Sequence, residues 1–320
     1  MKVIITIIII IFILGIVGSI LYSTYFKGKL AKIKPYGEII DVFDGKMHIV
    51  KMGNGPKTIV LLPGMGTALP SADFGPLMRE LSKNYTAVCI EYFGTGFSSE
   101  TQRERTCENY VEEIRTSLNN ADIKGPYVLM PHSISSVYSE FYASKYPNEV
   151  EAIISLDGTS TEYIGEAMPA FVKPLLNAAK IQQSLGLPSI AAILLKNKNK
   201  LKSYGYTEKE INDLCVYAGF SINNNTLSQI GNSAEFIKTV HNLDYPKEQV
   251  PYFKIISRDT YEAKDSQIKI SPEEYQLQHL KRVGAESNYE ILDGTHFIYL
   301  NNAEKIAGIA DSFIKNCDSE

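Results

Sequence analysis

A serine, an aspartate and a histidine stand in an order along the chain that would suit acyl transfer. Ser133 lies in "PHSIS", between an apolar strand-like run and a helix-like run. A serine hydroxyl is a weak nucleophile and needs a base to take its proton. His296, in "GTHF" near the chain end, could be that base, and Asp259, directly after the run "PYFKIIS", could hold its tautomer. The sequence therefore predicts catalysis by Ser133, Asp259 and His296.

Two other aspartates could supply the carboxylate instead. Asp265 lies six residues beyond Asp259, in the same expected loop. Asp157 ends the strand-like run that follows the candidate nucleophile. Asp259 is preferred for its place directly after a strand, but all three remain open.

A glycine-rich stretch, "LLPGMGT", follows an earlier apolar run. Gly64 and Gly66 let the backbone turn sharply and approach a ligand. The backbone N–H groups of Met65 and Ile134 are predicted to form an oxyanion hole. The stretch lacks the G-K-[ST] ending of a nucleotide-binding loop, so nucleotide binding is not expected.

Alternating strand-like and helix-like segments must position these residues. Apolar runs at 57–64, 85–94, 126–132 and 150–158 are separated by segments with helical spacing, for example 108–121. This alternation predicts an α/β fold, with a mostly parallel sheet and helices on both faces. Ser133 would then lie at the carboxyl edge of the sheet, where α/β proteins bind ligands.

Residues 159–248 break this rhythm and predict a helical insertion. Their apolar stretch from Met168 to Leu195 is expected to contribute to packing, and on such a fold it could also line an acyl pocket. The lysines at 196, 198, 200 and 202 predict a solvated loop, with contact to acidic lipids as the alternative. The strand-and-helix pattern returns after residue 248.

The N-terminus carries an apolar segment, Val3–Leu21, that would extend about 28 Å as a helix, roughly one bilayer core. It exceeds the usual apolar region of a cleaved signal peptide, so we expect residues 1–35 to form an uncleaved single-pass membrane anchor and linker. Four lysines follow it and one precedes it, which favours a cytoplasmic domain. Its extreme N-terminal position instead favours export, so the membrane side stays open.

Net charge and cysteine spacing limit the kinds of partner and cofactor that we expect for the chain. The net charge is −4 although the first 35 residues carry five lysines and no acid, so the remainder is acidic and a poor match for nucleic acid. The four cysteines are far apart and show no C-x-x-C spacing. No metal or organic cofactor is expected. The oligomeric state is left open.

From about residue 40 to its end, the chain resembles the α/β-hydrolase superfamily. The matching pieces are "LLPGMGT", "EYFGTGFSS", "PHSIS", the "RD" after a late strand, and "GTHF". The resemblance implies one α/β-hydrolase domain at 36–320 with a helical cap at about 159–248. It also implies a serine hydrolase with nucleophile, acid and base at Ser133, Asp259 and His296. Met65 and Ile134 match the oxyanion-hole positions of the family. The expected substrate is a small carboxylic ester; thioesters, lactones and amides, as in aminopeptidase-like relatives, remain open.

The serine turn departs from the G-x-S-x-G pattern of the family. Pro131 and Ser135 replace the two glycines. This departure supports a rival hypothesis, a non-catalytic binding or sensing protein at the membrane, because fold does not fix function. A lyase or a cofactor-free peroxidase on the same fold is a further alternative.

Overall fold

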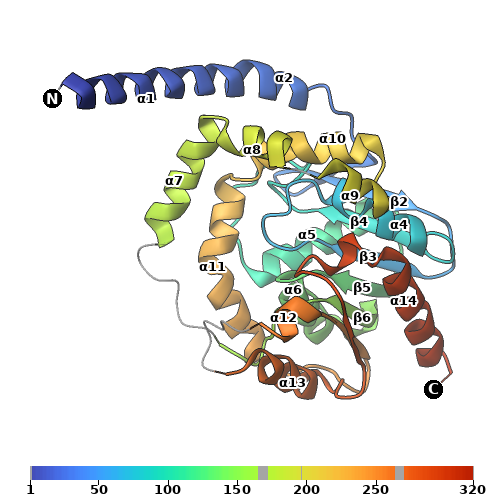
Figure 1. Ribbon diagram of the computed structural model, residues 1–320. Coiled ribbons are helices and arrows are strands. Elements are labelled where there is room, and N and C mark those ends of the chain that lie inside the picture. Colours follow the sequence, from blue (N-terminus) through green and yellow to red (C-terminus); the bar gives the residue numbers. More distant parts are fainter. Residues whose placement is uncertain (1, 165–171, 196, 264–269, 320) are drawn as a thin grey trace.

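The chain folds around an eight-stranded sheet that lies between two layers of helices (Figure 1). The structure, a computed structural model, describes residues 2–164, 172–195, 197–263 and 270–319. The strand order is β1-β2-β4-β3-β5-β6-β7-β8. β1 and β2 pair antiparallel, as do β2 and β4, and the remaining pairs are parallel. The strands are β1 Glu38–Val42, β2 Gly45–Met52, β3 Thr58–Leu62, β4 Thr86–Glu91, β5 Tyr127–Pro131, β6 Val150–Leu156, β7 Tyr252–Ser257 and β8 Tyr289–Leu292.

The central strands are apolar on both faces because both faces are covered. On β3, Val60 and Leu62 point into one core, and Ile59 and Leu61 point into the other. This follows from the two-residue period of a strand. A parallel strand covered by helices on both sides reads as a continuous apolar run, which explains the sequence pattern. The predicted mostly parallel sheet is confirmed.

The helices divide between the two cores. The first core takes buried side chains from α5 Cys107–Asn120, α6 Ser135–Lys145, α11 Asn224–His241 and α13 Pro272–Val283. The second core takes them from α4 Gly75–Leu81 and α14 Ala303–Cys317. α5 begins after Thr106, whose side chain caps it, and α13 ends at Gly284 in the left-handed conformation. Outside the segment between β6 and β7, the helices that follow β3 are α3 Pro70–Asp73, α4 Gly75–Leu81, α5 Cys107–Asn120, α6 Ser135–Lys145, α12 Arg258–Tyr261, α13 Pro272–Val283 and α14 Ala303–Cys317, with short helical turns η2 Pro147–Glu149 and η4 Ile298–Leu300.

Most of the described residues between β6 and β7 are helical. The helices are α7 Val172–Ser184, α8 Leu187–Leu195, α9 Lys198–Ser203, α10 Glu208–Tyr217, η3 Ala218–Phe220 and α11 Asn224–His241. We call this group, α7 to α11, the cap. The predicted lysine loop is in part the helix α9. The start of the apolar stretch, residues 165–171, lies outside the described residues.

The N-terminal helix lies outside the sheet domain and runs along the cap (Figure 1). α1 Lys2–Leu21 continues through the π-helix η1 Tyr22–Phe26 into α2 Lys27–Leu30. In the described part of the chain, one helix, Ile5–Leu30, is long and apolar enough to cross a membrane. A signal sequence near the N-terminus can also form a helix that is long and apolar enough by this criterion, so the finding alone does not establish an anchor.

The loop after β4 is held by a buried carboxylate. Glu91 accepts hydrogen bonds from the backbone N–H groups of Ser71, at 3.0 Å, and Phe97, at 2.6 Å. Gly96 lies directly over this carboxylate with φ 52°. A Cβ there would stand 1.9 Å from Glu91 Oε2. The Gly96 N–H also donates to Ala68 O, which joins this loop to the glycine-rich loop after β3.

Replacing Gly96 with alanine should therefore destabilise the fold by about 1–3 kcal/mol, through backbone strain and a displaced carboxylate. The matched control is Gly231→Ala in α11, where an added Cβ meets nothing within 4 Å. There we expect a gain of about 0.5–1 kcal/mol, because alanine favours a helix interior over glycine. Chemical unfolding of the full chain in detergent would measure both. Equal effects of the two substitutions would contradict this account of Gly96.

Candidate active site

Ser133 occupies a sharp turn between β5 and α6. Its φ is 54°, a left-handed conformation that is rare for a residue with a side chain. Backbone bonds on both sides fix the turn: Ser133 N–H donates to Leu156 O at 3.2 Å, and Ser133 O accepts from Thr159 N–H at 3.1 Å. Strained turns of this kind lift a nucleophile above the carboxyl edge of a sheet. The predicted position of Ser133 is the position found.

His296 joins Ser133 to a carboxylate. Its Nε2 lies 2.8 Å from Ser133 Oγ, and its Nδ1 lies 2.7 Å from Asp157 Oδ2. An ionised carboxylate is an acceptor only, so Nδ1 carries the proton and Nε2 is free to accept from the serine hydroxyl. The imidazole is 43% exposed, whereas the Asp157 side chain is fully buried. The imidazole is thus open to solvent, while the carboxylate beside it is shielded from water.

The structure does not join Asp259, the preferred choice for the acid, to the His296 ring by any hydrogen bond or ion pair of the described residues. Asp259 is the second residue of α12, it is exposed, and its backbone N–H donates to Gly294 O. The carboxylate that reaches His296 is Asp157, one of the alternatives left open by the sequence. Asp265 lies outside the described residues.

The end of β7 holds Asp157 in place. Ser257 N–H donates to Asp157 Oδ1 at 2.9 Å, and Thr260 Oγ1 donates to Oδ2 at 2.7 Å. Burial acts to raise the pKa of Asp157, but the hydrogen bonds from His296, Ser257 and Thr260 outweigh it and leave this pKa below its ordinary value. Asp157 is therefore ionised at neutral pH. The contacts of Ser257 and Thr260 with Asp157 were not predicted from the sequence; the spacing of these two residues as a helix cap was the available signal.

The glycine-rich loop lies against the serine turn. A Cβ on Gly64 would stand 3.1 Å from Ser133 Cβ and 2.4 Å from His132 Nδ1, so only glycine fits there. The N–H groups of Met65 and Ile134 donate to no acceptor within the described ranges. Ile134 is also the residue that precedes α6, where a helix dipole favours negative charge. The oxyanion-hole role of these two N–H groups stays a prediction.

Ser135 ties the serine turn to that loop. Its hydroxyl donates to Pro63 O and lies 2.9 Å from Tyr92 Oη. The side chain is fully buried. The residue that replaces the second glycine of the turn thus adds a bond that glycine would lack. Pro131, the other replacement, ends β5 opposite Leu62.

His132 links the turn to the histidine loop. Its Nε2 donates to the backbone oxygen of His296 at 2.9 Å. The centroids of the two imidazole rings are 4.7 Å apart. Burial, aided by the neighbouring His296, lowers the pKa of His132 to about 3. His132 is therefore neutral at physiological pH and places no competing charge beside the base.

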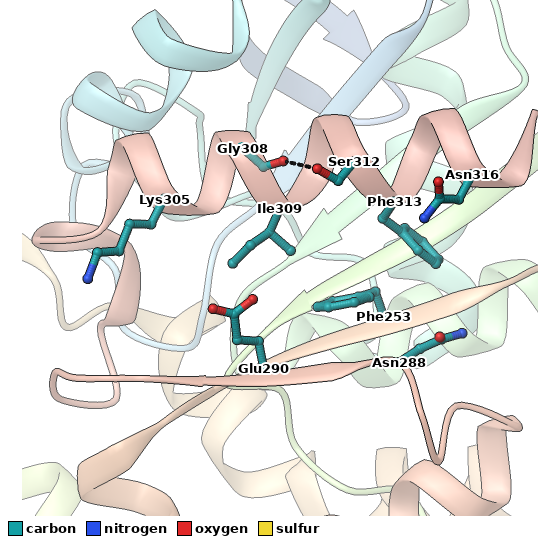
Figure 2. A pocket seen from close by; sticks show the side chains of 9 residues that line it. All are labelled: Phe253, Asn288, Glu290, Lys305, Gly308, Ile309, Ser312, Phe313 and Asn316. Atoms are coloured by element: carbon teal, nitrogen blue, oxygen red, sulfur yellow. Dashed lines mark hydrogen bonds between the residues drawn. The ribbon is translucent and has the colours of Figure 1, made fainter.

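A cavity of about 360 Å³ adjoins the His296 loop. Gly294 and Thr295 line it on one side, and Leu201 and Tyr204 of α9 on the other. A larger cavity, about 590 Å³, lies between the edge strand β8 and α14 and is lined by Phe253, Glu290 and Phe313 among others (Figure 2). It contains none of the residues described above. Within the described ranges, no group of three His, Cys, Asp or Glu residues is placed to hold a metal ion.

Comparison with known proteins places this geometry in a known fold. No family model matches the chain. The chain is 14% identical to the Cif epoxide hydrolase from Acinetobacter nosocomialis, with a TM-score of 0.66 over 93% of this chain and 96% of that one. It is 15% identical to the enol-lactonase from Burkholderia xenovorans, with a TM-score of 0.57 over 87% of this chain and 100% of that one. The chain therefore has the α/β-hydrolase fold.

The chain is also similar in sequence to proteins from two bacteria. YbdG of Bacillus subtilis, an uncharacterised protein, is 26% identical over 89% of this chain and 87% of its own length. The 2-(acetamidomethylene)succinate hydrolase of Mesorhizobium japonicum is 28% identical, over 38% of this chain and 42% of its own length.

Ser135→Ala should cost about 1–3 kcal/mol of unfolding free energy, because it leaves the buried Tyr92 hydroxyl and Pro63 oxygen without a partner. The matched control is Ser139→Ala in α6. Ser139 is also fully buried, but its hydroxyl has no hydrogen-bond partner within the described ranges, so we expect little change. Thermal unfolding of both variants in detergent tests this. An equal loss in both would mean that the Ser135 hydroxyl does not join the two loops.

Proposed function

We propose that this protein is a membrane-anchored serine hydrolase that cleaves small carboxylic esters. The single observation that carries the proposal is the continuous chain of hydrogen bonds from Ser133 through His296 to Asp157. The enol-lactonase and the Mesorhizobium hydrolase support hydrolytic chemistry on this fold. The helix at Ile5–Leu30 supports the anchor.

The reaction has two halves. Ser133 Oγ attacks the ester carbonyl carbon while His296 Nε2 takes the hydroxyl proton. The carbonyl oxygen becomes an anion, which the N–H groups of Met65 and Ile134 stabilise. His296 then gives the proton to the departing alkoxide, leaving an acyl-serine. Water, deprotonated by His296, attacks the acyl-serine; the acid is released as His296 returns this proton to Ser133 Oγ. Asp157 stays ionised and offsets the charge of the imidazolium.

Replacing Ser133 with alanine should lower kcat by a factor on the order of 10⁶, because no nucleophile remains. Hydrolysis of a panel of short-chain aryl esters by the full chain in detergent is the assay. The variant should show an unchanged unfolding transition. Undiminished turnover in a well-folded variant would contradict the proposal.

The two aspartates give a matched test of the acid. Asp157→Asn should lower kcat by a factor on the order of 10⁴, because an amide no longer holds the correct histidine tautomer. Asp259→Asn should leave kcat little changed, since its side chain is exposed and the carboxylate in contact with the His296 ring is that of Asp157. The reverse ranking in the same ester assay would restore Asp259 as the acid.

A further inference from the structure

The helical hairpin α7–α8 exposes apolar side chains that nothing in the protein covers. Beyond residue 26, eleven large apolar residues of the described chain are exposed, and five of them lie on these two helices. Leu187 and Leu194 lie on one face of α8 and are 50% and 75% exposed. α8 contains no ionisable residue. The packing predicted for the apolar stretch from Met168 to Leu195 is therefore wrong for much of the surface of α7 and α8. The five residues are Leu175, Ile181, Leu187, Ile193 and Leu194.

The turn between α7 and α8 touches the N-terminal helix at its glycines. A Cβ on Gly18 would stand 2.5 Å from Leu185 O, and one on Gly15 would stand 3.8 Å from Leu185 Cδ2. A Cβ on Gly186 would stand 3.4 Å from Gly18 O. Glycine on both partners permits this close backbone approach. One turn further on, the Tyr22 ring stacks on Phe220 with centroids 5.0 Å apart.

The position of this contact fixes the depth of the α7–α8 turn. Gly18 and Gly15 lie three and six residues before Leu21, where the apolar segment ends. At 1.5 Å per residue, these points lie about 5 and 9 Å inside that end. Interfacial helices bury their apolar face about 5–10 Å into a bilayer. A bilayer that surrounds α1 must therefore also reach the α7–α8 turn.

Lysines border the apolar surface on the side of α2. Lys29, Lys32 and Lys198 line a cavity of about 520 Å³ between α2 and the cap, together with Tyr25 and Ile193. The one acidic residue of this lining, Asp213, is paired with Lys209. Lys29 Nζ also lies 4.5 Å from the centroid of the Tyr25 ring. Lysine and tyrosine beside an apolar surface match the composition of a membrane interface, and the charge is complementary to anionic headgroups.

We propose that the α7–α8 hairpin is a second membrane-contacting element, which lies in the interface of an anionic phospholipid bilayer beside the N-terminal anchor. The proposal rests on the anchor proposed above and adds a surface to it. The cap is then held against the bilayer by two elements, and its lysine border contacts lipid phosphates. This arrangement uses apolar residues that the folded protein leaves exposed.

The chain contains no tryptophan, so an introduced one reports on a single position. We would prepare full-length Leu187→Trp, Ile10→Trp and Leu277→Trp proteins in vesicles of phosphatidylcholine and phosphatidylglycerol; Leu187 is exposed and lies next to the α7–α8 turn. Ile10 marks the middle of α1. Leu277 is 39% exposed on α13, which lies away from α1 (Figure 1), and is the matched control. The probes are acyl chains brominated at different depths, which quench indole fluorescence on contact.

Leu187→Trp should show blue-shifted emission and strongest quenching by shallow bromines. Ile10→Trp should be quenched best by deep bromines, and Leu277→Trp should not be quenched. Quenching of Ile10→Trp without quenching of Leu187→Trp would overturn the hairpin proposal and keep the anchor. Blue-shifted but unquenched emission of Leu187→Trp would also overturn it, because a second copy or another protein surface would then cover the hairpin. No quenching of Ile10→Trp would refute the anchor itself.

Discussion

Two strained turns on neighbouring strands are the constraint on which the rest of the site depends. Ser133 after β5 and Asp157 after β6 have φ values of 54° and 46°. Left-handed backbone at non-glycine residues costs free energy and persists only where surrounding structure enforces it. Here parallel pairing of β5 and β6 sets the two turns side by side. The turns bring a hydroxyl and a carboxylate to opposite sides of one imidazole.

The surrounding loops serve to hold these turns. Ser135 bonds the serine turn to Pro63, and His132 bonds it to the backbone of His296. Ser257 and Thr260 bond the carboxylate. Each contact comes from a different strand end, so the site is assembled by the sheet rather than by any one segment. Such preorganisation is what a reaction with developing charge requires.

Much of this arrangement was visible in the sequence. Continuous apolar runs predict buried parallel strands, and "PHSIS" and "GTHF" follow such runs, so Ser133 and His296 could be placed at one edge. The acid could not be placed in the same way. Asp157 and Asp259 both follow apolar runs, and the choice depends on side-chain direction. The positive φ at Asp157 sets that direction, and Gly158 permits the turn, since a Cβ there would stand 2.0 Å from Ser136 Oγ. The exposure of apolar side chains on the cap helices could not be predicted either, because an apolar stretch has the same sequence pattern whether it contacts protein or lipid.

The central claim is that Ser133 is an activated nucleophile. The most direct measurement is reaction of the full-length protein with a fluorophosphonate, followed by mass spectrometry of the modified peptide. The account predicts a single adduct on Ser133 that is lost in His296→Ala and strongly slowed in Asp157→Asn. A folded protein that takes up no label, or a label elsewhere with Ser133 unmodified, would contradict it and favour a non-catalytic binding protein on this fold.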